Sequence, residues 1–431
     1  MNHSNVLIIT YYWPPAGGPG VQRWLKFSQY LPEFGWKPIV YTPKNPSYPI
    51  IDETLMEEIH PEVSVLKTKI WEPYQIAERI YPKSKDYKAG HFEKKENQSL
   101  FSKFAVFIRG NFFIPDARKF WVKPSVKFLK DYLRAYPVDV IITTGPPHSM
   151  HLIGYELKKS NPKINWIADF RDPWTQISYH EELRLTSKSQ KKHRELEKQV
   201  FQSADLILAT SFTDAENYKN LGAKRVEVLT NGYEARDFQI GKIISSKFKI
   251  TYSGGLEVAR NPKVLWEALQ ELKTENLEFS KDLELVFWGN LSQEVKESIE
   301  KHHLGENLIL KGYVSHKESI QGIKNSDVLI LTNFPGVKSK GIIPGKLFEY
   351  MATGNPILAI GPEKGDVERI LNQTETGKYF QHTQKEEVKS YLLQLYALWK
   401  DNALNPVNPK VHQFSRQSLT ERLSHILAKF K

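Results

Sequence analysis

The stretch GIIPGKLFEYMATGNPIL, residues Gly341–Leu358, contains a Gly/Pro loop, a short amphipathic helix and an apolar strand in direct succession. Pro344 suits the first turn of the helix, and Gly354 suits the position just after its end. Lys346 lies at the helix N-terminus, where unsatisfied N–H groups and the helix dipole favour an anion such as a diphosphate. Glu349 points to the same side and suits the two hydroxyls of a ribose. We interpret the stretch as a nucleoside-diphosphate site, and the alternative is a surface helix with a solvated Lys–Glu pair.

The composition limits the partners that this chain of 431 residues can have. Its formal net charge of +11 fits nucleic acid, an anionic membrane surface or phosphorylated small molecules. No nucleic-acid-binding module is recognisable, so we expect no nucleic-acid partner. The chain has no cysteine, which excludes disulfides and suits a reducing cytoplasm. We find neither a signal peptide nor an apolar stretch of about 18 residues, so we expect a cytoplasmic protein without a spanning helix.

The first half of the chain alternates apolar runs with helical patterns, which is typical of a parallel sheet buried on both faces. The first run, Val6–Thr10, leads into a glycine-rich turn at Gly17 and Gly18, and a helical pattern follows. Doubly wound folds bind anions at such turns. Arg23 would lie in the first turn of this helix, where the dipole disfavours a cation. We expect it either to meet an anionic ligand or to be an ordinary surface residue.

Polar residues follow two later strands of this half. His148 comes after the strand predicted at residues 138–143, and Asp169, Arg171 and Asp172 follow one at 165–168. Two carboxylates and a guanidinium at one strand end either pair in a structural ion network or line a cleft that holds a polar substrate. We favour the cleft, because ligands bind at the carboxyl ends of parallel strands. A lone histidine such as His148 is more often a packing or capping residue than a catalyst.

The pattern restarts after residues 239–247, which we interpret as an interdomain linker. Further strands are predicted at 248–252, 283–288, 308–310, 328–331 and 356–360. The sequence therefore predicts an α/β protein in which two doubly wound domains, residues 1–238 and 248–410, face each other across a cleft. Residues 411–431 are expected to form a closing amphipathic helix that packs between the halves. Ser418 and Glu421 have the spacing of a capping box there.

Two segments of the first half are unusual in composition. Residues 83–99 are charged and poor in apolar residues, which predicts a mobile loop. Residues 101–123 alternate Phe and Trp with Lys and Arg. This pattern suits the surface of an anionic bilayer, and it also suits an amphipathic helix packed on the domain, which is the commoner case.

Several motifs together make the chain resemble the GT-B-fold glycosyltransferases of family 4, the group 1 retaining transferases. The bacterial members that build capsule, O-antigen or exopolysaccharide are the most similar. The motifs occur in the family's order over nearly the whole chain: YYWPPAGGPG, ADFRDPW, LTNG, YSGGLEVARNP, GYVSHKE and PGKLFEYMATGNPIL. The resemblance implies transfer of a sugar from a nucleotide-sugar donor to a glycan or polyprenyl-linked acceptor, with retention and with neither cofactor nor metal. A peripheral contact with the inner face of the plasma membrane is a further expectation.

The resemblance also implies residue roles. Glu349 matches the second Glu of the family's E-x7-E motif, which holds the donor ribose, and Gly341 replaces the first. Arg171 and Asp172 lie where relatives often have a His–Asp pair near the reacting carbon. The implied catalytic residues are Arg171, Asp172, Arg260 and Lys346. The implied donor-binding residues are Gly17, Gly18, Gly254, Gly255, Tyr313, Val314, Gly341, Pro344, Gly345 and Glu349. Arg23, His148 and Asp169 are implied on the acceptor side.

Two other functions remain open at this stage. A non-hydrolysing nucleotide-sugar epimerase shares the expected architecture, although we can assign no set of catalytic carboxylates and histidine to it. A non-catalytic nucleotide-binding relative would explain the replacement of the first Glu and the absence of the His. An assay with a nucleotide sugar and no acceptor would distinguish an epimerase, because only an epimerase would form a new sugar nucleotide.

Overall fold

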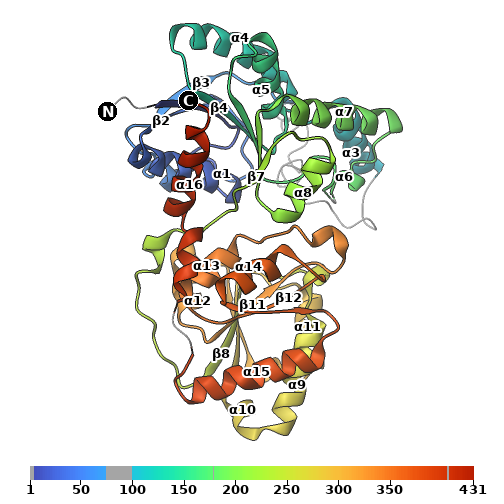
Figure 1. The fold of residues 1–431 in the computed structure, drawn as a ribbon. Coiled ribbons are helices and arrows are strands. Elements are labelled where there is room, and N and C mark those ends of the chain that lie inside the picture. Colours follow the sequence, from blue (N-terminus) through green and yellow to red (C-terminus); the bar gives the residue numbers. More distant parts are fainter. Residues whose placement is uncertain (1–3, 74–99, 178, 405–406) are drawn as a thin grey trace. The chain divides into compact units, whose positions relative to one another are not determined.

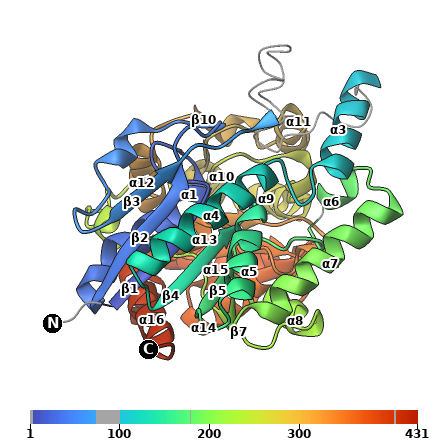
Figure 2. The ribbon, with the colours of Figure 1, turned by 90° about the horizontal axis from the view of Figure 1, so that it is seen from above.

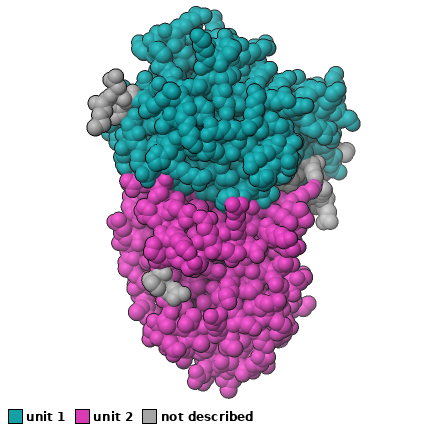
Figure 3. All heavy atoms as spheres, in the orientation of Figure 1, with its two compact units in different colours: residues 1–230, 419–431 teal, residues 231–418 magenta. Residues whose placement is uncertain are grey.

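The computed structural model describes residues 4–73, 100–177, 179–404 and 407–431. The predicted loop at 83–99 lies outside the described residues. Contacts within the chain divide it into two compact units. Unit 1 contains Met1–Thr230 and Leu419–Lys431, and unit 2 contains Asn231–Ser418 (Figure 3). Among the described residues, no helix has the length and apolar character needed to cross a membrane.

Unit 1 is built on a parallel sheet of seven strands in the order β3-β2-β1-β4-β5-β6-β7 (Figure 1). The strands are β1 Ser4–Ile9, β2 Trp36–Pro43, β3 Ser64–Thr68, β4 Val140–Gly145, β5 Trp166–Phe170, β6 Leu206–Ala209 and β7 Val226–Val228. The helices are α1 Pro19–Tyr30, α3 Leu100–Phe112, α4 Lys119–Ala135, α5 Ser149–Ser160, α6 Tyr179–Glu182, α7 Ser187–Ser203 and α8 Phe212–Asn220. The strand order reverses between β1 and β4, which is the doubly wound topology that the sequence predicted.

Both faces of this sheet are buried, as its uninterrupted apolar strands require. Leu7 and Ile9 of β1 pack on one face with residues of α4, α5, α7 and α8. Val6 and Ile8 pack on the other face with residues of α1 and of α16 Arg416–Ala428. Helices α4 and α5 run side by side over the first of these faces (Figure 2). Because the side chains of each strand pack into a core on both faces of the sheet, the carboxyl end of the strand is held on both sides.

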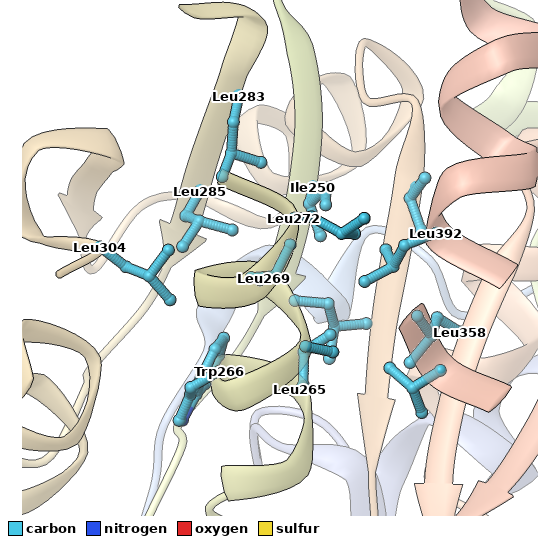
Figure 4. Close-up of a cluster of buried hydrophobic side chains, with 14 of the residues drawn as sticks. Ile250, Leu265, Trp266, Leu269, Leu272, Leu283, Leu285, Leu304, Leu358 and Leu392 are labelled. Atoms are coloured by element: carbon cyan, nitrogen blue, oxygen red, sulfur yellow. The ribbon is translucent and has the colours of Figure 1, made fainter. Parts of the chain in front are cut away.

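Unit 2 repeats the design with six parallel strands in the order β10-β9-β8-β11-β12-β13. The strands are β8 Phe248–Ser253, β9 Leu283–Trp288, β10 Leu308–Gly312, β11 Val328–Thr332, β12 Ile357–Gly361 and β13 Gly377–Gln381. The helices are α9 Lys263–Glu275, α10 Leu277–Asp282, α11 Gln293–Lys301, α12 His316–Lys324, α13 Lys346–Thr353, α14 Asp366–Thr374 and α15 Lys385–Lys400. One core joins β8 and β9 to α9, where Ile250, Leu265 and Leu269 are fully buried (Figure 4).

The C-terminal helix differs from the expectation in two ways. Its cap is Ser415, whose hydroxyl accepts a hydrogen bond from the Ser418 N–H, so Ser418 is not the N-cap residue. The apolar side chains of α16 belong to the core of unit 1 rather than to a packing position between two halves. The reason is its apolar stripe, which includes Leu423 and Ile426 and completes the sheet face that α1 covers only in part.

Candidate functional site

The predicted donor residues gather in unit 2 where its strand order reverses, between β8 and β11. Ligands of doubly wound sheets bind outside the carboxyl ends of the strands at this switch point. The turn Ser253–Gly255 leaves the end of β8, and Arg260 closes the 3-10 turn η6 Val258–Arg260 directly after it. Helix α13 begins nearby in space, because Lys346 contacts this turn.

Three glycines lie at the strand ends that border this region. Gly254, Gly289 and Gly312 follow or end β8, β9 and β10, and all three have positive φ angles of 100°, 118° and 68°. The N–H of Gly254 donates to the Trp288 carbonyl at 2.6 Å, and the N–H of Gly289 donates to the Gly312 carbonyl at 2.7 Å. A Cβ on Gly289 would lie 2.7 Å from the carbonyl oxygen of Gly254, so no other residue fits there. Our sequence analysis did not assign Gly289 to the site.

Lys346, the first residue of α13, points towards the turn that contains Gly254. Its Nζ donates to the Ser253 carbonyl, lies 4.0 Å from the ring centroid of Tyr252, and would lie 2.8 Å from a Cβ on Gly254. Burial, followed by the nearby Arg260 charge, lowers the pKa of Lys346 to about 7, and Glu349 opposes this shift. A lysine that is buried beside another cation is stabilised in its charged form by an incoming anion.

Arg260 contacts the same turn. Its Nη2 donates to the Gly255 carbonyl at 2.8 Å, and its guanidinium carbon lies 5.5 Å from the ring centroid of Phe334. The carbonyl of Arg260 accepts a hydrogen bond from Thr332 at the end of β11. Nε of Arg260 is buried without a hydrogen-bond partner. Within the described parts of the chain, neither Arg260 nor Lys346 has an ion pair with a carboxylate, so two cations converge with unneutralised charge.

The loop before α13 adds backbone donors. Gly345 is the N-cap of the helix, and Pro344 precedes it rather than lying in the first turn as the sequence suggested. The first N–H groups of a helix have no partner within the helix, which favours an anion at this end. Asn333 holds the loop by donating to the Ile342 carbonyl at 2.8 Å, one residue after Gly341. At the other end, Gly354 adopts the left-handed conformation predicted for it, with a φ of 79°.

Glu349 lies one turn further along α13 and contacts a residue that our sequence analysis missed. Nε2 of His316, the first residue of α12, lies 3.1 Å from Oε1 of Glu349. The hydrogen bond to Glu349 raises the pKa of His316, while burial opposes the shift. The motif GYVSHKE contains this histidine, but two helices far apart in sequence make the pair, so sequence spacing carried no signal for it. Residues Leu347 and Met351 of α13 are buried.

Tyr313 and Val314 form the short connection between β10 and α12. Tyr313 is 90% exposed, and Val314 is half-buried. The positive φ of Gly312 turns the chain away from the sheet at this point. The two residues therefore present backbone groups beside the His316–Glu349 pair, and the resemblance implies donor binding for both of them.

In unit 1, Asp169 forms a buried ion pair with Arg23 rather than with Arg171, and Arg23 is therefore not the surface residue that was one expectation for it. Nη2 of Arg23 lies 2.8 Å from Oδ1 of Asp169, and both side chains are buried. Arg23 also donates to the carbonyls of Leu229 and Thr230, and Trp24 donates to the same carboxylate. Although burial opposes the charge, Arg23 holds the pKa of Asp169 below its usual value. The pair ties α1 to β5, so these two side chains do not line an open substrate surface.

Arg171 follows β5 and donates to three backbone carbonyls, those of Gly20, Gly145 and Pro146. It therefore ties the ends of β4 and β5 to the start of α1. The neighbouring Asp172 is exposed and accessible to a ligand. Of Asp169 within β5 and Arg171 and Asp172 after it, Asp172 is the exposed residue.

His148 is buried at the start of α5, and its ring stacks on Trp174 with centroids 4.9 Å apart. Burial, followed by nearby His151, lowers the pKa of His148 well below its usual value. Gly17 and Gly18 lie in the loop between β1 and α1. A Cβ on Gly17 would meet Ile50 at 2.9 Å, and Gly18 has a φ of 85°. The glycines are thus required by the loop itself, whether or not the loop also binds a ligand.

The arrangement in unit 2 suits a phosphorylated ligand. Two cations and a helix N-terminus can bind a diphosphate, and a carboxylate one turn away can accept hydrogen bonds from a sugar diol. Among the described residues, no group of three or more His, Asp or Glu side chains is placed to hold a metal ion. The absence of a metal or cofactor requirement stays a prediction.

Comparison with known proteins identifies the fold. Residues 234–405 match the family model of group 1 glycosyl transferases. No curated protein sequence matches the chain. Sucrose-phosphate synthase from Thermosynechococcus elongatus aligns over 99% of each chain, with a TM-score of 0.61 and 12% identity. Anabaena Alr3699/HepE in complex with UDP aligns over 99% of this chain and 100% of its own, with a TM-score of 0.59 and 11% identity.

WaaG, a glycosyltransferase involved in lipopolysaccharide biosynthesis, aligns over 98% of this chain and 99% of its own. Its TM-score is 0.53 at 13% identity. Similarity at such low identity shows the fold alone. The two sheets and these matches confirm the GT-B fold predicted from the sequence, and the match of unit 2 supports a group 1 glycosyl transferase domain.

Proposed function

We propose that the protein transfers a sugar from a nucleotide-sugar donor to a glycan or lipid-linked glycan acceptor in cell-surface polysaccharide biosynthesis, with retention of anomeric configuration. The observation that carries the proposal is the convergence of Lys346, Arg260 and the N-terminus of α13 on one turn at the switch point of unit 2. The group 1 family match over residues 234–405 supports the same reaction class.

The chemistry that these groups supply is stabilisation of the leaving diphosphate. When the bond between the anomeric carbon and the diphosphate breaks, negative charge grows on the departing oxygen. Lys346 and Arg260 would neutralise this charge without rearrangement, because the turn and Tyr252 already hold them in place. Removing one such contact typically costs about 2–4 kcal/mol in the barrier. Glu349 would hold the donor ribose and would affect binding more than turnover.

Fewer side chains of unit 1 remain candidates for binding the acceptor than the sequence suggested. Asp172 is exposed at the end of β5, whereas Asp169 is buried and ion-paired. We therefore assign Asp172 as the unit 1 side chain that orients the acceptor hydroxyl. Retention by attack from the donor face would need no strong base at this position.

The test begins with a thermal-shift screen of nucleotide sugars, because a ligand that binds the folded protein raises its melting temperature. With the best donor, we expect Lys346→Ala and Arg260→Ala to lower kcat about 30-fold or more, and Glu349→Ala to raise the donor KM. Lys301→Ala, at the exposed end of α11, is the matched control and should behave as wild type. Unchanged donor affinity and turnover in all three site variants would exclude the proposal.

Incubation of the best donor without an acceptor separates the alternatives. A glycosyltransferase should give at most slow hydrolysis, and an epimerase would give a new sugar nucleotide. A non-catalytic nucleotide-binding relative would bind the donor and consume it with no acceptor from a panel of glycans and polyprenyl-linked glycans.

A peripheral contact with an anionic membrane belongs to the same proposal, and it is supported by α4, which begins inside the segment 101–123 that suggested it. Phe120, Lys123, Lys127 and Phe128 are all exposed along one side of this helix. Trp71 is 52% exposed and packs edge-on against Phe120, with centroids 4.7 Å apart. Exposed aromatic rings among lysines suit the headgroup region of an anionic bilayer.

A further inference from the structure

We infer that His316 is a positioning residue for donor binding: its imidazole fixes the Glu349 carboxylate in the orientation that receives the ribose diol. The inference rests on the proposed function and deepens it, since it adds a residue to the ribose subsite. The supporting observation is the hydrogen bond of 3.1 Å between Nε2 of His316 and Oε1 of Glu349, which joins α12 to α13.

The imidazole of His316 is attached to the first turn of α12, whose N-terminus is fixed by hydrogen bonds. Ser315 is the N-cap of α12, and it forms a complete capping box with Glu318. The Ser315 N–H and hydroxyl donate to the Glu318 carboxylate at 2.9 Å and 2.7 Å. His316 is the next residue, so its backbone is held at the position from which the ring reaches Glu349.

The carboxylate keeps acceptor capacity for a ligand. Within the described residues, the imidazole of His316 is the hydrogen-bonding partner of the Glu349 side chain, and it uses one position on Oε1. A carboxylate has about four acceptor positions on its two oxygens. Two ribose hydroxyls can therefore bind without displacing His316. The side chain of Glu349 is 31% exposed and that of His316 is 63% exposed, so a ligand can reach both.

The charges around His316 favour this arrangement near neutral pH. Glu349 on α13 and Asp237 on the 3-10 turn η5 Ala235–Phe238 raise the pKa of His316, whereas Arg416 at the start of α16 lowers it. The Nε2–H donates to the carboxylate in the protonated ring and also in the neutral tautomer that carries its hydrogen on Nε2. The contact therefore persists over the whole range in which the protein would bind a donor.

A purely structural role explains the pair less well. Exposed ion pairs contribute little to folding stability, because water screens them and the side chains lose rotamer freedom. A carboxylate that is already oriented loses less freedom when a ligand binds, which improves affinity for groups that contact it. The effect of His316 should therefore depend on whether the ligand carries the ribose hydroxyls.

The experiment compares two ligands on four proteins by calorimetry. UDP, GDP, ADP and CDP are titrated into wild type, and the tightest is used together with its 2′,3′-dideoxy form. The proteins are wild type, His316→Ala, His316→Gln and the control His302→Gln, which changes a histidine at the end of α11 whose Nδ1 lies 2.6 Å from the backbone carbonyl oxygen of Ser298. We expect His316→Ala to weaken the ribose ligand about five- to tenfold and to leave the dideoxy ligand unchanged. Glutamine should restore most of the loss, because its amide can donate to Glu349.

Two further readouts separate positioning from structure. With the nucleotide-sugar donor, His316→Ala should raise KM and leave kcat nearly unchanged. In NMR spectra of wild type, the imidazole signal that disappears in His316→Gln should titrate at a lower pH after Glu349→Gln. Equal weakening of both ligands, or no weakening of either, would overturn the inference.

The outcome also separates this inference from the proposed function. Glu349→Ala is titrated with the same two ligands for this purpose. If it affects only the ribose ligand while His316→Ala affects neither, the ribose subsite stands and the role of His316 is wrong. If Glu349→Ala does not distinguish the two ligands, or if none of the four diphosphates binds, the proposed function and the inference both fail.

Discussion

Lys346 is the residue on which the proposed donor site most depends. The Ser253 carbonyl, the Tyr252 ring and the Gly254 turn enclose its ammonium group, and no described carboxylate pairs with it. Its pKa is lowered to about 7, chiefly by burial and then by Arg260. A diphosphate bound at this position would favour the charged lysine, so ligand binding and proton uptake are linked.

We therefore expect nucleoside diphosphate binding at pH 8 to take up close to one proton, and binding at pH 6 to take up almost none. The sign follows from the lowered pKa, because Lys346 is mostly neutral at pH 8 and already charged at pH 6. Affinity should fall as the pH rises from 7 to 9. Calorimetry in buffers of different ionisation enthalpy measures the uptake.

Lys346→Arg is the control for this linkage, since arginine stays charged throughout the range. It should bind with a much weaker pH dependence than wild type. Proton uptake by Lys346→Arg that equals the wild-type value would assign the titration to another group, such as His316.

At the scale of elements, the strand ends were easier to predict than the contacts between helices. The strand at residues 283–288 was predicted with the boundaries that the structure shows, because it is a continuous apolar run that ends at Gly289. Helix α7 begins at Ser187 with Thr186 as its N-cap, although our sequence analysis identified no helix start there. Its first turns are polar, including the buried Ser189 and His193, so no apolar periodicity marked them.

Helix α4 gives an element-scale prediction for membrane contact. Vesicle flotation should recover the protein with vesicles that contain phosphatidylglycerol and not with pure phosphatidylcholine. The double variant Phe120→Ser with Lys123→Glu should reduce binding at least tenfold, since burying one Phe contributes about 2 kcal/mol. Added salt should also weaken the binding, because lipid charge contributes to it.

The matched control for this variant is Leu277→Ser with Lys281→Glu on the exposed α10 of unit 2. It removes the same kinds of side chain from another surface helix and should bind as wild type. Recovery with both vesicle types, or an equal loss in the two double variants, would contradict a role for α4. A soluble acceptor would then be favoured.

At the scale of the whole molecule, the chain contains two sheets with separate cores, and we assign the donor to one unit and the acceptor to the other. The predicted diphosphate groups all belong to unit 2, whereas the candidate acceptor residue Asp172 belongs to unit 1. We expect hydrogen exchange with a bound nucleoside diphosphate to show protection at residues 253–260, 312–316 and 341–349. Amide protection confined to the strand ends of unit 1 would contradict this prediction, because it would indicate that the donor binds to unit 1.

The sequence by itself determined the repeated parallel sheets and the elements that carry the proposed donor site. Apolar runs, glycine turns and helix-end residues act locally, so Gly254, Lys346 and Glu349 could be identified from their neighbours in the chain. Only the tertiary structure decided which charges meet. It paired Arg23 with Asp169 across 146 positions and placed His316 on Glu349 across 33. Electrostatic partners depend on distance in space, and a sequence of spread charges does not specify which of them the packed helices bring together.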